Sequence, residues 1–186
     1  MKILVVGPSW VGDMMMSQSL YRTLRARYPQ AIIDVMAPAW CRPLLSRMPE
    51  VNEAIPMPLG HGALAIGERR KLGHSLRERR YDRAYVLPNS FKSALVPFFA
   101  NIPLRTGWRG EMRYGLLNDA RVLDKDAWPL MVERYVALAY DNGVMRCAKD
   151  LPQPLLWPQL QVNEGEKSQA CSAFNLSNDR PIIGFC

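Results

Sequence analysis

Asp13 combines a chemically useful side chain with a position between a glycine-containing loop and an amphipathic helix. An apolar run at 2–6 precedes the loop 7–12, and a helical period begins at Asp13. In an open α/β sheet, such a loop lies at the carboxyl end of a strand, where ligands bind. A carboxylate there can act as a general base. It can equally be an N-cap or first-turn acid that stabilises the helix by about 0.5–2 kcal/mol, and the pattern leaves both interpretations open.

The same loop matches neither of the two common nucleotide-binding fingerprints. Gly7 and Gly12 have P-loop spacing, but Asp13 and Met14 stand where that motif requires Lys and Ser or Thr. Ser9 occupies the place of the second glycine in the dinucleotide fingerprint. The loop therefore weakens the interpretation of this region as an ATP site or as half of a nicotinamide-dependent oxidoreductase.

Three polar residues follow another apolar run, 83–87, in the same way. Asn89, Ser90 and Lys92 come directly after this predicted strand. Because the carboxyl ends of parallel strands meet at one edge of a sheet, we expect these side chains to face the same crevice as Asp13.

Basic residues are concentrated in two segments. Residues 68–83 carry seven Lys or Arg against three acids. On a helix, Leu72 and Leu76 would face inward, and Arg69, Arg70 and Arg77 would face solvent or a ligand. A second cluster contains Arg105, Trp108, Arg109 and Arg113. The segment 68–83 can be a solvated helix face or a positively charged surface that binds carboxylates and phosphates. Trp108 can stack on a sugar ring or pack in the hydrophobic core.

The elements that must position these residues alternate between strands and helices. Strands are expected at 2–6, 31–36, 51–57, 83–87 and 104–107, and helices at 13–28, 41–48, 63–80, 90–99, 129–142 and 164–174. This alternation predicts an α/β fold, a Rossmann-like doubly wound parallel sheet over residues 1–150. The proline-rich segment that follows is expected to begin an interdomain connector, 151–180, and residues 181–186 to be the first strand of a second, truncated domain.

Composition narrows the class of protein further. The 186 residues include 24 Lys and Arg against 17 Asp and Glu, a net charge of +7 that favours an anionic partner. The four cysteines and two histidines form neither a zinc motif nor a disulfide framework, so we expect no metal and a reducing, cytoplasmic location. An alternative class is a basic α/β nucleic-acid- or nucleotide-binding module, but no nucleic-acid motif is present.

Several stretches resemble the glycosyltransferase family that builds the lipopolysaccharide inner core, glycosyltransferase family 9. The resemblance is carried by residues 2–20, Tyr28-Pro29, 34–36, 87–93, 105–108 and 183–186. It implies the N-terminal half of a two-domain GT-B enzyme. That enzyme would transfer L-glycero-D-manno-heptose from ADP-heptose to heptosyl-Kdo2-lipid A, with inversion and without a cofactor. The family's donor-binding loops would lie beyond residue 186, so this chain alone is expected to be inactive.

The resemblance also assigns roles to the residues singled out above. Asp13 matches the family's proposed base, which makes Asp13 the expected catalytic residue. The expected substrate-binding residues are Ser9, Trp10, Gly12, Arg69, Arg70, Asn89, Ser90, Lys92, Trp108, Arg109 and Arg113. Because the acceptor carries acyl chains, we also hypothesise peripheral contact with the inner face of the inner membrane, through an edge of Phe98, Phe99 and Trp108 beside Arg105 and Arg109.

Overall fold

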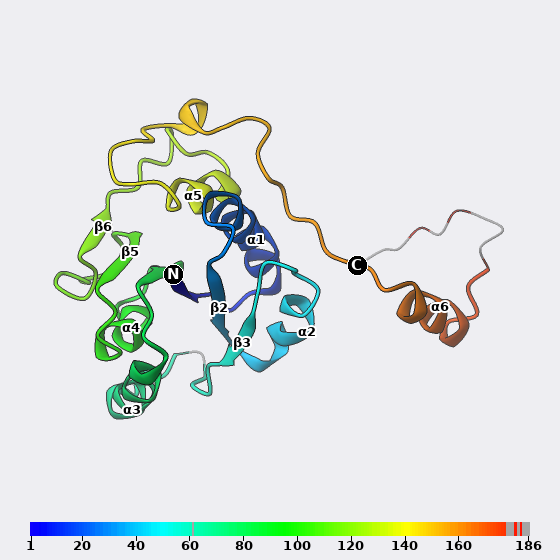
Figure 1. The fold of residues 1–186 in the computed structure, drawn as a ribbon, viewed down its shortest axis with the longest axis horizontal. Helices are drawn as coiled ribbons and strands as arrows, with labels where there is room; N and C mark the ends of the chain where they lie inside the picture. The colour runs from blue at the N-terminus through cyan, green and yellow to red at the C-terminus, as the bar shows by residue number, and fades with distance from the viewer. Residues whose placement is uncertain (61, 178–180, 182, 184–186) are drawn as a thin grey trace.

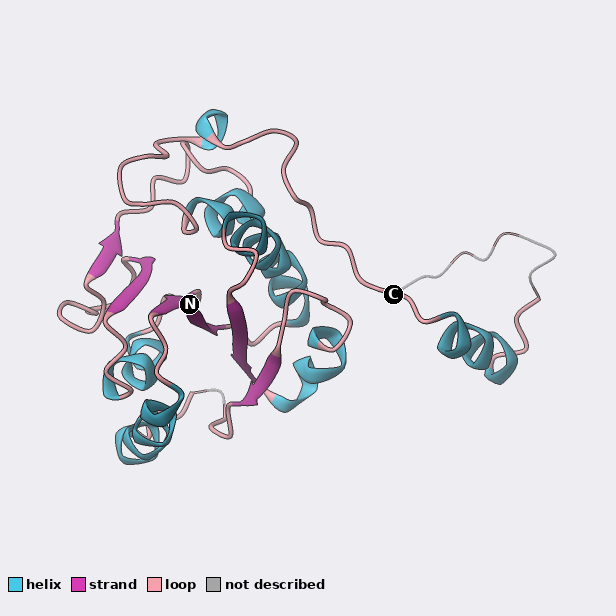
Figure 2. Ribbon diagram, in the orientation of Figure 1, coloured by secondary structure: helices cyan, strands magenta, loops and turns pink. Residues whose placement is uncertain are grey.

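The computed structural model describes residues 1–60, 62–177, 181 and 183, and its centre is a six-stranded parallel sheet (Figures 1 and 2). The strand order is β3-β2-β1-β4-β5-β6, the order of a Rossmann-type sheet. The strands are β1 (Lys2–Val6), β2 (Ile32–Ala37), β3 (Glu53–Pro56), β4 (Arg83–Val86), β5 (Leu104–Trp108) and β6 (Asp119–Arg121). The predicted fold class is confirmed.

Helices cover both faces of the sheet, which explains why its central strands are apolar throughout. Alternate residues of β1 enter different cores: Ile3 and Val5 pack under α1 (Val11–Arg27) and α5 (Met131–Ala137). Leu4 and Val6 pack on the opposite face under α3 (Ile66–Leu76) and α4 (Leu95–Phe99). A strand buried on both faces reads as a continuous apolar run, the pattern that the sequence showed at 2–6.

Helix α1 begins two residues earlier than predicted, and this changes the position of Asp13. Trp10 is the N-cap residue and the helix starts at Val11, so Asp13 lies in the first turn. Asp13 is therefore a first-turn residue and not the N-cap.

Helix α5 ends at Ala137, well before the predicted end at residue 142. The Arg121 guanidinium donates to the Ala137 carbonyl at 3.0 Å, and Tyr140 N–H also donates there, at 3.3 Å. These donors take the acceptor that Asp141 would need to extend an α-helix. Gly143, next to the predicted helix end, has a φ of +83° but lies six residues beyond Ala137, so it does not terminate α5.

The other predicted helices are shorter than expected. The helix predicted at 63–80 is α3 followed by a 3₁₀ turn, Arg77–Arg79. In place of the helix predicted at 41–48, the structure has a 3₁₀ turn, Ala39–Cys41, and the short helix α2 (Arg42–Leu45). In place of the helix predicted at 90–99, it has a 3₁₀ turn, Phe91–Ala94, and α4. Pro97 lies in the first turn of α4, where a missing N–H breaks no helical bond. The sequence analysis missed β6, whose three residues Asp-Ala-Arg carry no apolar run.

Beyond residue 150 the chain leaves the sheet and runs, largely extended, to α6 (Glu164–Ala173), which Figure 1 shows set apart from the sheet. No residue of α6 is buried. The strand expected at 181–186 falls mostly outside the described residues, and the domain boundaries stay predictions. Within the described part of the chain, no helix is long and apolar enough to cross a membrane.

Candidate functional site

A cavity of about 460 Å³ opens at the carboxyl edge of the sheet, and we call it the main pocket. Loops after β1, β3, β4, β5 and β6 line it, together with the first turn of α1 and one side of α5. Its lining residues are Pro8, Ser9, Trp10, Asp13, Gly62, Leu87, Pro88, Asn89, Ser90, Lys92, Trp108, Glu111, Leu123, Met131, Arg134 and Tyr135. Of the twelve site residues predicted from the sequence, the main pocket brings seven together: Ser9, Trp10, Asp13, Asn89, Ser90, Lys92 and Trp108.

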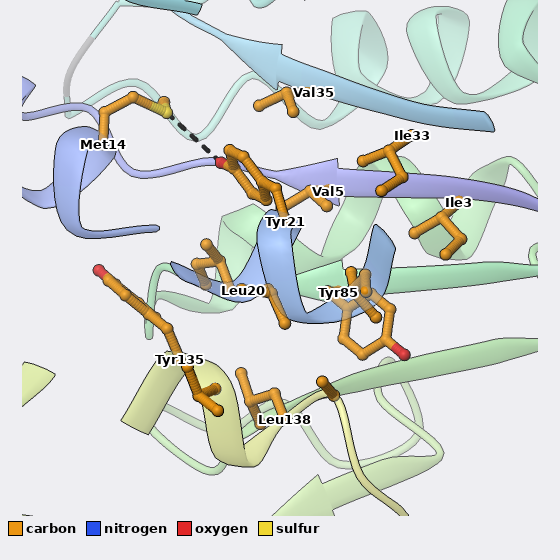
Figure 3. Packing of buried hydrophobic residues seen from close by; sticks show 14 of the residues in the cluster. Ile3, Val5, Met14, Leu20, Tyr21, Ile33, Val35, Tyr85, Tyr135 and Leu138 are labelled. Atoms are coloured by element: carbon orange, nitrogen blue, oxygen red, sulfur yellow. Dashed lines mark hydrogen bonds between the residues drawn. The ribbon is translucent and has the colours of Figure 1, made fainter. Parts of the chain in front are cut away.

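Asp13 is half-buried and lines the main pocket from the first turn of α1. The next residue, Met14, is fully buried, and its carbonyl and its sulfur both accept hydrogen bonds from Ser17. The Tyr21 hydroxyl also donates to the Met14 sulfur, at 3.5 Å (Figure 3). These contacts attach the first turn of α1 to the hydrophobic core, so the Asp13 backbone is held in one place at the wall of the main pocket.

The loop after β4 is held by the loop after β5. Gly110 packs so closely that a Cβ atom there would lie 2.3 Å from the Asn89 carbonyl oxygen. Glu111 N–H donates to the same carbonyl at 3.1 Å, and the Glu111 carboxylate accepts the Phe91 N–H at 2.7 Å. The sequence analysis missed Glu111, although this acid brings a second negative charge to the main pocket.

Helix α5 contributes three residues that the sequence analysis also missed: Met131, Arg134 and Tyr135. The Arg134 guanidinium donates to the carbonyls of Trp128 and Pro129, at 2.7 and 3.1 Å. Burial raises the pKa of Tyr135, and the negative charge of Asp13 raises it further, so this phenol stays protonated at neutral pH. No local pattern indicates these residues, because α5 reaches the site only by packing against α1.

Trp108 forms a wall of the main pocket but is only 7% exposed. Its indole N–H donates to the Arg134 carbonyl at 3.0 Å, and its ring packs against Trp128 at 6.3 Å between centroids. Both contacts give Trp108 a structural role and leave little of the ring for a sugar. Because Trp108 is buried, it does not form part of the hypothesised membrane edge. Phe98 and Phe99 lie before β5 in the chain, whereas Trp108 is the last residue of β5.

Two arginines predicted to bind substrate are buried and serve the fold. Arg69 is 4% exposed and donates to the carbonyls of Leu64, Ala63 and Lys92. Arg113 is 1% exposed and donates to the Pro88 and Trp108 carbonyls and the Ser93 hydroxyl. Burial lowers the pKa of Arg113 to about 10, which still leaves it charged at neutral pH. Arg113 does not line the main pocket, and its contact with a ligand stays a prediction.

The remaining predicted residues lie outside the main pocket. Gly12, Arg70 and Arg109 are exposed and do not line it. Arg77 donates to the Phe99 carbonyl at 2.9 Å and so ties α3 to α4. Leu72 and Leu76 pack inward, as predicted.

A smaller cavity of about 120 Å³ adjoins the main pocket on the β2 and β3 side, and we call it the side groove. The two cavities share Ser9, Pro88, Ser90 and Lys92. The side groove is completed by Val6, Gly7, Met36, Pro38, Trp40, Met57, Leu59, Gly60, Arg69 and Ser93. Arg69 thus reaches a cavity wall, although carbonyl groups already occupy its guanidinium.

The described residues contain no cluster of three or more His, Cys, Asp or Glu that could hold a metal ion. Cys41, Cys147 and Cys171 are free thiols.

The strand order and the cavity at the carboxyl edge of the sheet define a Rossmann-type domain with a polar pocket. The family model of glycosyltransferase family 9 (heptosyltransferase) matches residues 69–186, and the chain belongs to this family.

Relatives from enteric bacteria are very similar. Lipopolysaccharide heptosyltransferase 2 of Salmonella typhimurium is 90% identical over the whole chain and that of Escherichia coli 88%; the chain covers 53% of each. The solved E. coli ADP-heptose LPS heptosyltransferase II aligns with a TM-score of 0.89 and 84% identity, over 97% of this chain and 53% of that one. The chain thus spans about half the length of the relatives it matches.

Proposed function

We propose that this chain is the acceptor-binding half of an inverting heptosyltransferase. The full enzyme would move L-glycero-D-manno-heptose from ADP-heptose to heptosyl-Kdo2-lipid A. The observation that carries this proposal is the half-buried Asp13 carboxylate on the wall of the main pocket, within a family of heptosyltransferases. The donor would be held mainly by residues outside this chain.

In the proposed reaction, Asp13 accepts the proton of one acceptor hydroxyl. The oxygen then bonds to the anomeric carbon of the heptose from the face opposite the phosphate. The bond between that carbon and the phosphate oxygen breaks, and ADP leaves with the electron pair. General-base assistance of this kind contributes about 10²–10⁴-fold to a rate.

The other polar residues of the main pocket would orient the acceptor. Asn89 and Ser90 offer an amide and a hydroxyl for sugar hydroxyl groups, and Lys92 offers a cation for an acidic group. Ser9 and Trp10 form the wall next to Asp13. Binding through several such groups would place the reacting hydroxyl within reach of the carboxylate.

The test is Asp13→Asn in a protein extended to the length of the relatives. We expect turnover to fall by about two to four orders of magnitude while the affinity for ADP-heptose is unchanged, because only the proton acceptor is lost. Initial rates and donor-binding calorimetry measure the two quantities. Glu111→Gln is the matched control, since a glutamine oxygen still accepts the Phe91 N–H, and it should keep most of the turnover. Near-normal turnover of the Asp13→Asn variant would reduce Asp13 to a first-turn acid.

Contact with the membrane also stays a proposal, now through a smaller edge. Phe98 is 38% exposed, and the Arg105 guanidinium lies 5.6 Å from its ring centroid. An aromatic ring beside a cation suits the interface of an anionic membrane. Sedimentation with anionic vesicles, comparing the wild type with Phe98→Ser, tests this edge, and equal binding by both would exclude it.

A further inference from the structure

Trp40 is an exposed tryptophan that is nevertheless held in a fixed orientation. It lies in the 3₁₀ turn directly after β2, on the rim of the side groove, and 59% of its surface is exposed. Its indole N–H donates to the Ser9 carbonyl at 2.9 Å, which ties the ring to the loop that leads to Asp13. This hydrogen bond therefore holds the Trp40 ring at the side groove in one orientation.

The apolar character of the side groove extends beyond Trp40. Met36, Met57 and Leu59 line it as well, while Ser90 provides a hydroxyl near the boundary with the main pocket. A surface with one aromatic face and a few polar groups suits a sugar ring, which presents C–H groups on its faces and hydroxyl groups at its edge.

The charges in the two cavities differ. Asp13 and Glu111 offset Lys92 and Arg134 in the main pocket. Among the described residues that line the side groove there are two cations, Lys92 and Arg69, and no carboxylate. Because the Arg69 guanidinium already donates to three carbonyls, Lys92 is the cation better placed to meet a ligand. The side groove therefore favours an anionic ligand, and the main pocket does not.

We propose that the side groove is a second sugar subsite, which holds a carboxylate-bearing sugar of the acceptor against the face of Trp40. The carboxylate would lie near Lys92, the residue that both cavities share. A neighbouring sugar of the same acceptor would then occupy the main pocket beside Asp13. This inference rests on the proposed function, because it assumes that the ligand is an acidic oligosaccharide.

The fixed orientation of Trp40 explains why such a subsite would add affinity. A ring already held by a hydrogen bond loses little conformational freedom when a ligand binds. Removing the ring removes this contact, whereas removing only its N–H frees the ring. We therefore expect Trp40→Ala to bind more weakly than Trp40→Phe, and both more weakly than the wild type.

The experiment titrates this chain with the heptosyl-Kdo2 trisaccharide, which carries two carboxylates, and with its dimethyl ester, using calorimetry. Trp40→Ala should weaken binding of the acid about three- to tenfold. Trp157→Ala is the matched control, because Trp157 is also exposed, at 51%, and lines neither cavity, so its affinity should be unchanged. Circular dichroism checks that each variant is folded.

The ester tests the charge. The wild type should prefer the acid to the ester, and Lys92→Gln should bind both equally. If the wild type binds the acid but Trp40→Ala and Lys92→Gln bind as the wild type does, the subsite is excluded and the proposed function stands. If the wild-type chain binds no acceptor sugar, acceptor binding by this half and the subsite are both overturned.

Discussion

Arg109 and Arg113 lie four residues apart in the sequence but have opposite environments. Comparing their substitutions tests which arginines stabilise the folded state. Arg113 is buried among the loops behind the main pocket, whereas Arg109 is exposed. Arg113→Ala should lower the free energy of unfolding by about 3 kcal/mol, because two buried acceptors and one partly buried acceptor lose their donor. Arg109→Ala should change it by no more than about 0.5 kcal/mol. Urea unfolding of both variants measures the difference, and equal stabilities would contradict a structural role for Arg113.

Two side chains of α1 bond to the extended segment after residue 150: Arg22 donates to the Trp157 carbonyl, and Gln18 bonds to Gln159. Gln18 is fully buried, accepts the Gln159 N–H at 2.8 Å and donates to the Gln159 carbonyl at 2.9 Å. It also donates to Glu50 at 3.1 Å. The amide thus bonds to the connecting segment in both directions, in the way that a neighbouring strand would.

Gln18→Ala should release this segment locally. We expect hydrogen exchange of the Gln159 amide to accelerate by at least about tenfold, since a hydrogen bond contributes about 0.5–1.5 kcal/mol and the side chain makes two to this residue. The Gln161 amide, which donates to the Arg47 carbonyl at 2.9 Å, serves as the internal control. Unchanged exchange at Gln159 would show that other contacts hold the segment.

Strand β3 is tied to the turn after α3 by an ion pair that depends on pH. The Arg79 guanidinium donates to both carboxylate oxygens of Glu53, and this lowers the pKa of that carboxyl below its usual 4.5. The pair therefore contributes its full stability above the unfolded-state pKa of Glu53, and the contribution is lost as the pH falls through the lower folded-state pKa.

Glu53→Gln should make this dependence visible. Because both side chains are exposed by more than a third, we expect a loss of no more than about 1 kcal/mol at pH 7. The difference from the wild type should shrink as the pH falls below 4.5. Thermal unfolding of both proteins from neutral to acidic pH measures it, and a gap that stays constant would assign the effect of the substitution to something other than charge.

The net charge of +7 overstates the positive charge that the whole molecule offers to an anionic partner, because several arginines form hydrogen bonds inside the fold. Arg69, Arg105 and Arg113 all donate to backbone carbonyls. Association with a short DNA duplex should therefore be electrostatic, fall steeply between about 50 and 200 mM salt, and be no tighter than about 1 μM at about 150 mM. Fluorescence anisotropy across salt concentrations measures this, and nanomolar binding at the higher salt would favour the nucleic-acid alternative.

Most of the predicted residues that line the main pocket lie in the loop, or in the first turn of the helix, that follows a strand. Asp13, Asn89, Ser90 and Lys92 could be found because a parallel sheet brings the carboxyl ends of its strands together. The burial of Arg69 and Arg113 was not predicted, because the sequence around an arginine does not show whether folding will surround it with carbonyl groups. Trp40 was not singled out at all, since its relation to Ser9 exists only between two loops 31 residues apart.

From the sequence alone one can derive the parallel α/β fold and its buried central strands, because apolar runs and helical periods are local patterns. The family came from the resemblance of particular stretches, such as residues 2–20 and 87–93, and not from these periods. Only the folded chain shows that α5 brings Arg134 and Tyr135 to the same cavity as Asp13, and that a second cavity lies beside it. The physical reason is that burial and charge at the site depend on contacts between segments far apart in the chain. No local pattern of residues specifies such contacts.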